Sequence, residues 1–150
     1  MRTSVDTHSP EETRALGVRV AAALEAGDVI ALDGELGSGK TELVKGLANG
    51  LGVTAPVHSP TFVLHHHYPG RIPLEHYDLY RLDGASWVDA GLDEPAAGAI
   101  AVIEWPARAA PLDEWATIQI DLTVLGESAR RLVLRRGPER IQRVFNAAGD

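Results

Sequence analysis

The chain of 150 residues is long enough for one domain with a buried core, and we expect a single domain over residues 1–150. Its 14 basic and 21 acidic residues give a net charge of −7, which argues against unaided binding of nucleic acid, because neutralising phosphates normally requires a basic surface. The absence of cysteine excludes disulfides, zinc fingers and a thiol nucleophile. No signal segment and no apolar run of membrane-spanning length occurs, so we expect a cytoplasmic protein without membrane contact.

Helix and strand patterns alternate in the first part of the chain. Residues 9–12, Ser-Pro-Glu-Glu, predict a helix start with an N-cap serine, a proline in the first turn and a capping box. Its apolar stripe continues to Leu24, and Gly27 stands where a C-terminal cap belongs. The apolar run 29–32 then predicts a buried strand, and residues 42–48 predict a second helix.

Residues 34–41, Gly-Glu-Leu-Gly-Ser-Gly-Lys-Thr, fit the pattern G-x-x-x-x-G-K-[ST] between that strand and that helix. Glycines let backbone N–H groups converge on phosphate oxygens, and the helix N-terminus adds partial positive charge. Lys40 would reach the β- and γ-phosphates, and the Thr41 hydroxyl would bind Mg²⁺. We therefore expect a nucleotide site that is formed by Gly37, Ser38, Gly39, Lys40 and Thr41.

Strands gather in the second part of the chain. In chain order, the patterns predict strands over 61–68 and 72–82, a short helix over 87–92, a buried strand over 100–103, a hairpin over 117–136 and a helix over 139–147. The whole order predicts an α/β fold: a mostly parallel sheet flanked by helices, with an antiparallel C-terminal hairpin.

A magnesium–nucleotide site also needs a carboxylate outside the loop. Glu104 follows the most apolar later strand, and open α/β sheets place ligands at such strand ends. A carboxylate that merely caps a backbone turn is the alternative. Asp78 has apolar neighbours that would draw it inward, where an aspartate is costly unless it is paired or bound to a metal. The alternative here is a partly exposed aspartate with local hydrogen bonds.

Other signals stay open at this point. The Thr61 hydroxyl could approach a γ-phosphate from a Ser-Pro-Thr loop, and Trp105 could stack on a base or close the edge of the core. Of the three adjacent histidines only His65 and His67 share a strand face and could share a metal, although a strand decorated with histidines is favoured. The arginines between residues 130 and 143 indicate a solvated face rather than a phosphate contact.

Taken together, residues 34–41, 59–62, 76–82 and 102–106 resemble the TsaE family, the small bacterial ATPases of tRNA threonylcarbamoyladenosine biosynthesis, over roughly residues 9 to 136. The resemblance implies a P-loop NTPase fold, ATP and Mg²⁺ as cofactors, and action with the TsaB–TsaD complex. That complex modifies the adenosine 3′ to the anticodon, so tRNA would be reached only indirectly, through the complex.

The resemblance also implies roles for individual residues. Lys40 and Thr41 would hold the phosphates and Mg²⁺, and Glu104 would supply a carboxylate to the metal. Asp78 matches a family aspartate near the metal and the attacking water, and Thr61 matches a switch-like threonine. The resemblance also implies that Thr13 lies near the nucleotide. It assigns no arginine finger: Arg81 could serve as one, but a group supplied by the partner fits a slow, partner-dependent cycle better.

Three other functions compete with a partner-dependent ATPase. A small-molecule kinase would need an acceptor pocket and usually an arginine-rich lid, for which the chain has no long insertion. A GTPase would need an Asn-Lys-x-Asp segment, and neither Lys40 nor Lys45 follows an asparagine. A non-catalytic nucleotide-binding adaptor remains open, because family members can hydrolyse poorly alone.

Overall fold

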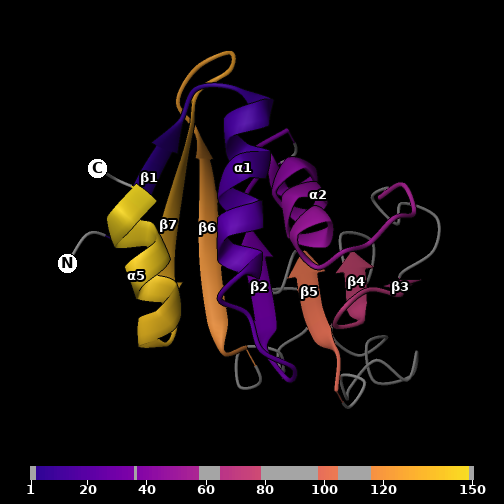
Figure 1. Cartoon of the computed structure of the whole chain (residues 1–150). Coiled ribbons are helices and arrows are strands. Elements are labelled where there is room, and N and C mark those ends of the chain that lie inside the picture. Colours follow the sequence, from indigo (N-terminus) through magenta and orange to yellow (C-terminus); the bar gives the residue numbers. More distant parts are fainter. Residues whose placement is uncertain (1–2, 36, 58–64, 79–97, 105–115, 149–150) are drawn as a thin grey trace, which may run out of the picture.

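The computed structural model describes residues 3–35, 37–57, 65–78, 98–104 and 116–148, which form one seven-stranded sheet with helices packed on it (Figure 1). The strands are β1 (Ser4–Thr7), β2 (Val29–Asp33), β3 (His65–Tyr68), β4 (Leu74–Asp78), β5 (Ile100–Glu104), β6 (Ile118–Val124) and β7 (Arg130–Arg136). The helices are α1 (Pro10–Ala21), α2 (Lys40–Gly50) and α5 (Glu139–Ala148).

The strand order is β1-β7-β6-β2-β5-β4-β3. The four central strands β6, β2, β5 and β4 run parallel, whereas β3 at one edge and β7 and β1 at the other run antiparallel to their neighbours. In register, Leu32 and Asp78 both lie opposite Glu104, so β2, β5 and β4 end at one edge of the sheet. This arrangement confirms the predicted mostly parallel α/β fold with its antiparallel C-terminal hairpin.

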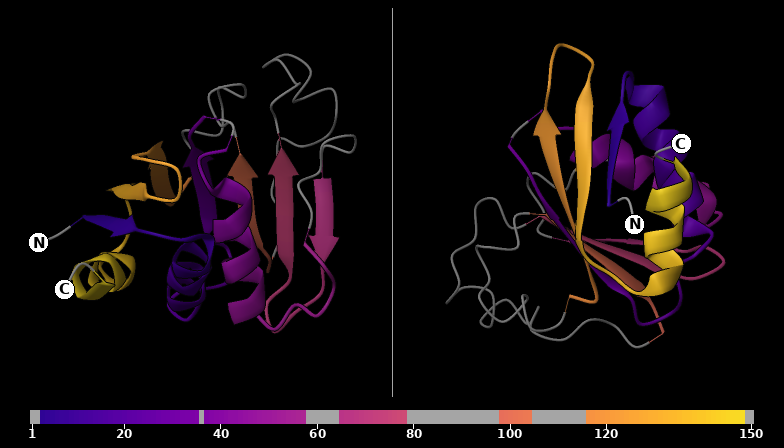
Figure 2. Two further views of the ribbon diagram at one scale, coloured as in Figure 1. Left: turned by 90° about the horizontal axis from the view of Figure 1, so that it is seen from above. Right: turned by 90° about the vertical axis from the view of Figure 1, so that its left-hand side faces the viewer.

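Helices α1, α2 and α5 lie on the same face of the sheet (Figure 2). The buried stripe of α1 and that of α2 join the apolar strand residues of this face in one core. Glycines let α1 and α2 touch at their backbones: a Cβ atom on Gly46 would lie 2.1 Å from the carbonyl oxygen of Arg14, and one on Gly17 would lie 2.6 Å from that of Leu43. The position of α2 against α1, and so of the loop before α2, depends on this close approach.

The start of α1 follows the predicted capping rules, but its end does not. Ser9 accepts a hydrogen bond from the Glu12 N–H at 3.1 Å, and the Glu12 carboxylate accepts one from the His8 N–H at 3.2 Å. The helix ends at Ala21, and Gly27, with φ of +95°, instead forms the turn before β2, where its N–H donates to the Ala99 carbonyl. The left-handed conformation of Gly27 therefore serves the turn into β2 and not the C-terminal cap of α1.

Strand β1 was not predicted. It has four residues, of which Val5 and Thr7 are buried, and within the described residues it pairs only with β7. A run this short carries too little alternation to be recognised before its partner strand is known.

Several predicted elements lie outside the described residues: the helix over 87–92 and the outer parts of the strands over 61–68 and 72–82. The final helix and the hairpin were predicted within one or two residues of α5, β6 and β7. None of the helices in the described part of the chain is long and apolar enough to cross a bilayer.

Candidate nucleotide-binding site

The glycine-rich loop connects β2 to α2 at the carboxyl edge of the parallel strands. Gly37 and Gly39 adopt φ of +78° and +102°, a backbone region that favours glycine. A Cβ atom on Gly34 would lie 2.6 Å from the Ser38 hydroxyl and 2.8 Å from the Leu122 carbonyl. The three glycines of the motif are thus required by the path of the loop itself.

The N-terminus of α2 has the features of an anion site. Its N-cap is Gly39, which offers no side-chain hydrogen bond to the first turn, so the helix N–H groups there have no side-chain cap. The Ser38 hydroxyl is buried and has no hydrogen-bond partner within the described chain. Uncapped N–H groups and an unsatisfied hydroxyl fit the oxygen atoms of a phosphate.

Lys40 lies at the centre of this site. It is 5% exposed, and its ammonium group donates to the carbonyl of Gly34. Burial lowers the pKa of Lys40, while the charges of Glu104, Asp78 and Asp33 act in the opposite direction. The lysine therefore shares one electrostatic environment with the carboxylates at the strand ends.

Asp78 and Glu104, the two predicted carboxylates, are brought together. They are directly paired on β4 and β5, and they are 9% and 3% exposed. The structure thus places Asp78 among buried side chains rather than in the partly exposed position considered as an alternative. Oxygen ligands at adjacent strand ends, near the hydroxyl-bearing first turn of α2, fit the preference of Mg²⁺.

His76 is a site residue that sequence reasoning missed. It is fully buried, and its Nε2 lies 2.5 Å from a carboxylate oxygen of Glu104. Its Nδ1 is buried without a hydrogen-bond partner in the described chain. The available signal was the two-residue spacing from Asp78, which places both side chains on one strand face.

The two predicted threonines of the described site occupy different positions. Thr41 is half-buried in the first turn of α2. Thr13 of α1 is buried behind the loop: its methyl group lies 3.9 Å from the point where a Cβ on Gly39 would stand. The hydroxyls of Thr13 and Thr7 are 2.8 Å apart and hydrogen bonded. Thr13 therefore supports the loop, and direct contact with a nucleotide stays a prediction.

The histidines of β3 bind a glutamate. Both His65 and His67 hydrogen bond to the buried carboxylate of Glu75 on β4, the latter at 2.7 Å, and His66 contacts the Tyr68 hydroxyl at 2.9 Å. Within the described residues, no group of three or more His, Cys, Asp or Glu side chains is arranged to hold a metal ion. The favoured interpretation, a strand decorated with histidines, agrees with these contacts.

Thr61 and Trp105, predicted for the γ-phosphate and the base, lie outside the described residues. A second missed residue, Arg130 of β7, donates to the Gly37 carbonyl of the loop at 3.1 Å. Its position depends on the pairing of β6 with β2, which brings the hairpin beside the loop and which the local sequence does not reveal.

Comparison with known proteins gives one consistent family. Residues 7–132 match the family model described as threonylcarbamoyl adenosine biosynthesis protein TsaE. The tRNA threonylcarbamoyladenosine biosynthesis protein TsaE of Bacillus subtilis is 39% identical over 145 residues, which cover 96% of this chain and 85% of the relative. That of Nostoc is 42% identical over 127 residues, with 81% and 78% covered. The crystal structure of Bacillus subtilis YdiB superposes with a TM-score of 0.73 at 30% identity, covering 99% of this chain and 94% of YdiB.

Proposed function

We propose a biochemical role for this chain, which belongs to the TsaE family and so serves tRNA threonylcarbamoyladenosine biosynthesis. In this role it binds and hydrolyses Mg²⁺-ATP in concert with the TsaB–TsaD complex. The observation that carries the proposal is the placement of Lys40, buried between the glycine loop and the paired carboxylates Asp78 and Glu104. A buried ammonium beside uncapped N–H groups favours a multiply charged anion, because the attraction and hydrogen bonds to the anion compensate for the hydration that the buried groups lose.

The roles of the residues follow from their positions. The Lys40 ammonium and the N–H groups of residues 39–41 would bind the phosphates. The Thr41 hydroxyl with Glu104 and Asp78 would hold Mg²⁺, which supplies positive charge that draws electrons from the phosphate oxygens. One of these two carboxylates would also accept a hydrogen bond from the attacking water and orient it.

Two alternatives call for direct comparison. A small-molecule kinase would bind ATP through the same loop but would form ADP only with an acceptor present. A nucleotide-binding adaptor would bind ATP without hydrolysing it. We favour hydrolysis, because the described residues include the lysine and carboxylates of a hydrolytic site. Hydrolysis would be slow in the chain alone and faster with TsaB–TsaD. In this proposal Thr61 is the switch residue and Trp105 stacks on the base.

The test is the variant Lys40→Ala with Lys45→Ala as its control. Lys45 lies on the same helix, but it is half-exposed and its ammonium is 3.5 Å from Glu42. We expect Lys40→Ala to weaken equilibrium binding of Mg²⁺-ATP by about a hundredfold, as the loss of a charged hydrogen-bond donor implies, and to abolish tRNA modification with purified components. Lys45→Ala should leave both unchanged.

Each result separates the candidate functions. Absence of saturable ATP binding by the unchanged protein would reject the proposal. ATP binding without phosphate release, even with TsaB–TsaD, would establish the adaptor. Release of ADP that requires an added acceptor would establish the kinase.

A further inference from the structure

Arg130 bridges the hairpin and the phosphate-binding loop. Strand β6 runs parallel to β2, so the turn after β6 and the loop after β2 meet at the same edge of the sheet. The turn is closed by the Leu125 N–H, which donates to the Ala129 carbonyl at 3.0 Å. Arg130 folds back over it: Nη1 donates to the carbonyls of Gly126 at 2.9 Å and Ala129 at 2.8 Å, and Nη2 donates to that of Gly37 at 3.1 Å.

On the loop side, Arg130 contacts a peptide group whose carbonyl and N–H both have hydrogen-bond partners. The carbonyl of the Gly37–Ser38 peptide accepts from Arg130, and the N–H of the same peptide donates to the Glu35 carbonyl at 3.0 Å. The Cγ of Arg130 lies 3.8 Å from the point where a Cβ on Gly39 would stand. One side chain therefore supports both left-handed glycines of the loop, one by a hydrogen bond and one by packing.

The charge of Arg130 is also distinctive. In the described part of the chain its guanidinium is bonded only to carbonyl oxygens. Its neighbour Arg131, by contrast, pairs with the Asp6 carboxylate at 2.8 Å. The positive charge of Arg130 thus adds to that of Lys40 and of the α2 N-terminus beside the loop, where it attracts an anion.

We infer that Arg130 is a positioning residue of the phosphate-binding loop: from the hairpin it fixes the Gly37–Ser38 peptide in the conformation that receives a nucleotide's phosphates. This inference rests on the proposed function. A loop that is ordered before binding loses less conformational entropy when the ligand arrives, so nucleotide affinity is higher with the bridge than without it. Lysine keeps the charge but lacks the fork that reaches the turn and the loop together, so it restores only part of the effect.

The experiment compares Arg130→Ala and Arg130→Lys with the control Arg131→Ala in the full chain. Titration with Mg²⁺-ATP and Mg²⁺-ADP measures affinity, and hydrogen–deuterium exchange of residues 37–41 without nucleotide measures order in the loop. We expect Arg130→Ala to weaken the binding of both nucleotides about tenfold, which is the scale of one hydrogen bond to a charged group. It should also speed hydrogen–deuterium exchange in the loop. Arg130→Lys should weaken nucleotide binding less, and Arg131→Ala should change neither nucleotide affinity nor exchange in the loop.

The inference is overturned if Arg130→Ala and Arg131→Ala bind nucleotide equally, or if loop exchange is the same in both. If Arg130→Ala does not fold, the decision passes to Arg130→Lys against Arg131→Lys with the same two readings, and equality again overturns it. Failure of the unchanged protein to bind nucleotide would reject the proposed function instead, whereas the exchange measurement without nucleotide would still report whether Arg130 orders the loop.

Discussion

The buried pair of His76 and Glu104 determines how the carboxylate is held at the end of β5. Nε2 of His76 donates to one carboxylate oxygen at 2.5 Å, and both side chains are buried. A buried carboxylate that loses its donor retains its desolvation penalty without compensation. His76 thus helps to hold Glu104 in one orientation at the end of the strand.

Replacement of His76 tests this arrangement. We expect His76→Leu to lower the free energy of unfolding by about 1–3 kcal/mol, because Glu104 is left buried without its partner. His76→Gln, whose amide N–H can reach a similar position, should recover part of the loss and should keep more of the Mg²⁺ dependence of ATP binding. Urea unfolding and Mg²⁺ titrations at fixed ATP are the measurements. Leu and Gln variants of equal stability would contradict the role of the hydrogen bond.

At this scale, the sequence predicts residues that belong to local patterns. Lys40 follows from its motif, and Glu104 and Asp78 follow from their places at strand ends. His76 and Arg130 act through partners 28 and 93 residues away, so their roles depend on strand pairing that the sequence does not display. Non-local register is the physical reason for both omissions.

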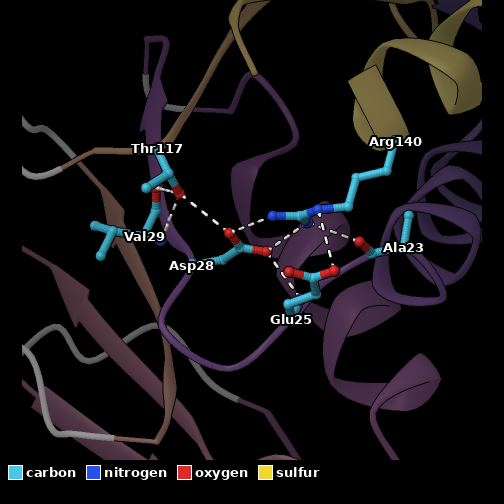
Figure 3. A network of polar contacts seen from close by, with 6 residues as sticks. All are labelled: Ala23, Glu25, Asp28, Val29, Thr117 and Arg140. Atoms are coloured by element: carbon cyan, nitrogen blue, oxygen red, sulfur yellow. Dashed lines mark hydrogen bonds and ion pairs between the residues drawn. The ribbon is translucent and has the colours of Figure 1, made fainter. Parts of the chain in front are cut away.

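At the scale of elements, α5 is tied to the turn before β2 by one arginine (Figure 3). Arg140 donates to both oxygens of Asp28, at 2.8 and 2.9 Å, and to the Ala23 carbonyl at 2.8 Å. Burial raises the pKa of Asp28, but hydrogen bonds from Arg140, from the Glu25 N–H and from Thr117 outweigh it, and the net pKa is lowered. The same pairing raises the pKa of Arg140. Sequence reasoning assigned this arginine to a solvated face, because only the packed helix brings it to Asp28.

Arg140→Ala is expected to lower the free energy of unfolding by about 3 kcal/mol, because it leaves the Asp28 carboxylate buried without its partner. Arg143→Ala is the matched control on the same helix. Its partner, Glu139, is 2.9 Å away, but both side chains are exposed, so a loss of less than about 0.5 kcal/mol is expected. Urea unfolding at neutral pH measures the free energy of unfolding of both variants. Similar losses in the two variants would contradict the stabilising role of the Arg140–Asp28 pair.

The Arg140–Asp28 pair also predicts how the free energy of unfolding depends on pH. A carboxyl group whose pKa is lower in the folded state stabilises the fold fully above its unfolded value, 3.8 for aspartate, and loses that contribution as the pH falls through the folded value. The stability difference between the unchanged protein and Arg140→Ala should therefore be fully present near neutral pH and should shrink as the pH falls and Asp28 becomes protonated. A difference that grows as the pH falls would contradict this sign.

At the scale of the whole molecule, the arginines near the C-terminus are largely neutralised by carboxylates. The pairs are Arg131 with Asp6, Arg135 with Asp121, Arg140 with Asp28 and Arg143 with Glu139. With a net charge of −7, little positive potential remains to attract a nucleic acid. The composition indicates the excess of acidic over basic residues. The structure adds which carboxylate pairs with each of these arginines, and composition cannot identify those pairs.

The chain alone is therefore expected not to retain tRNA. Non-specific binding of nucleic acid has dissociation constants of about 10⁻⁴ to 10⁻⁶ M for proteins with a basic surface, and an acidic protein should bind more weakly still. Filter binding at about 50 mM salt, where phosphate contacts are strongest, should show no saturation at micromolar protein. Addition of the proposed partner, TsaB–TsaD, should retain tRNA on the filter. Saturable binding by the chain alone, with an affinity that falls steeply as salt is raised, would mean that arginines now paired with carboxylates exchange them for phosphates. In that event the contact with tRNA would be direct, and the proposed partner complex would no longer be needed to explain how an acidic protein takes part in tRNA modification.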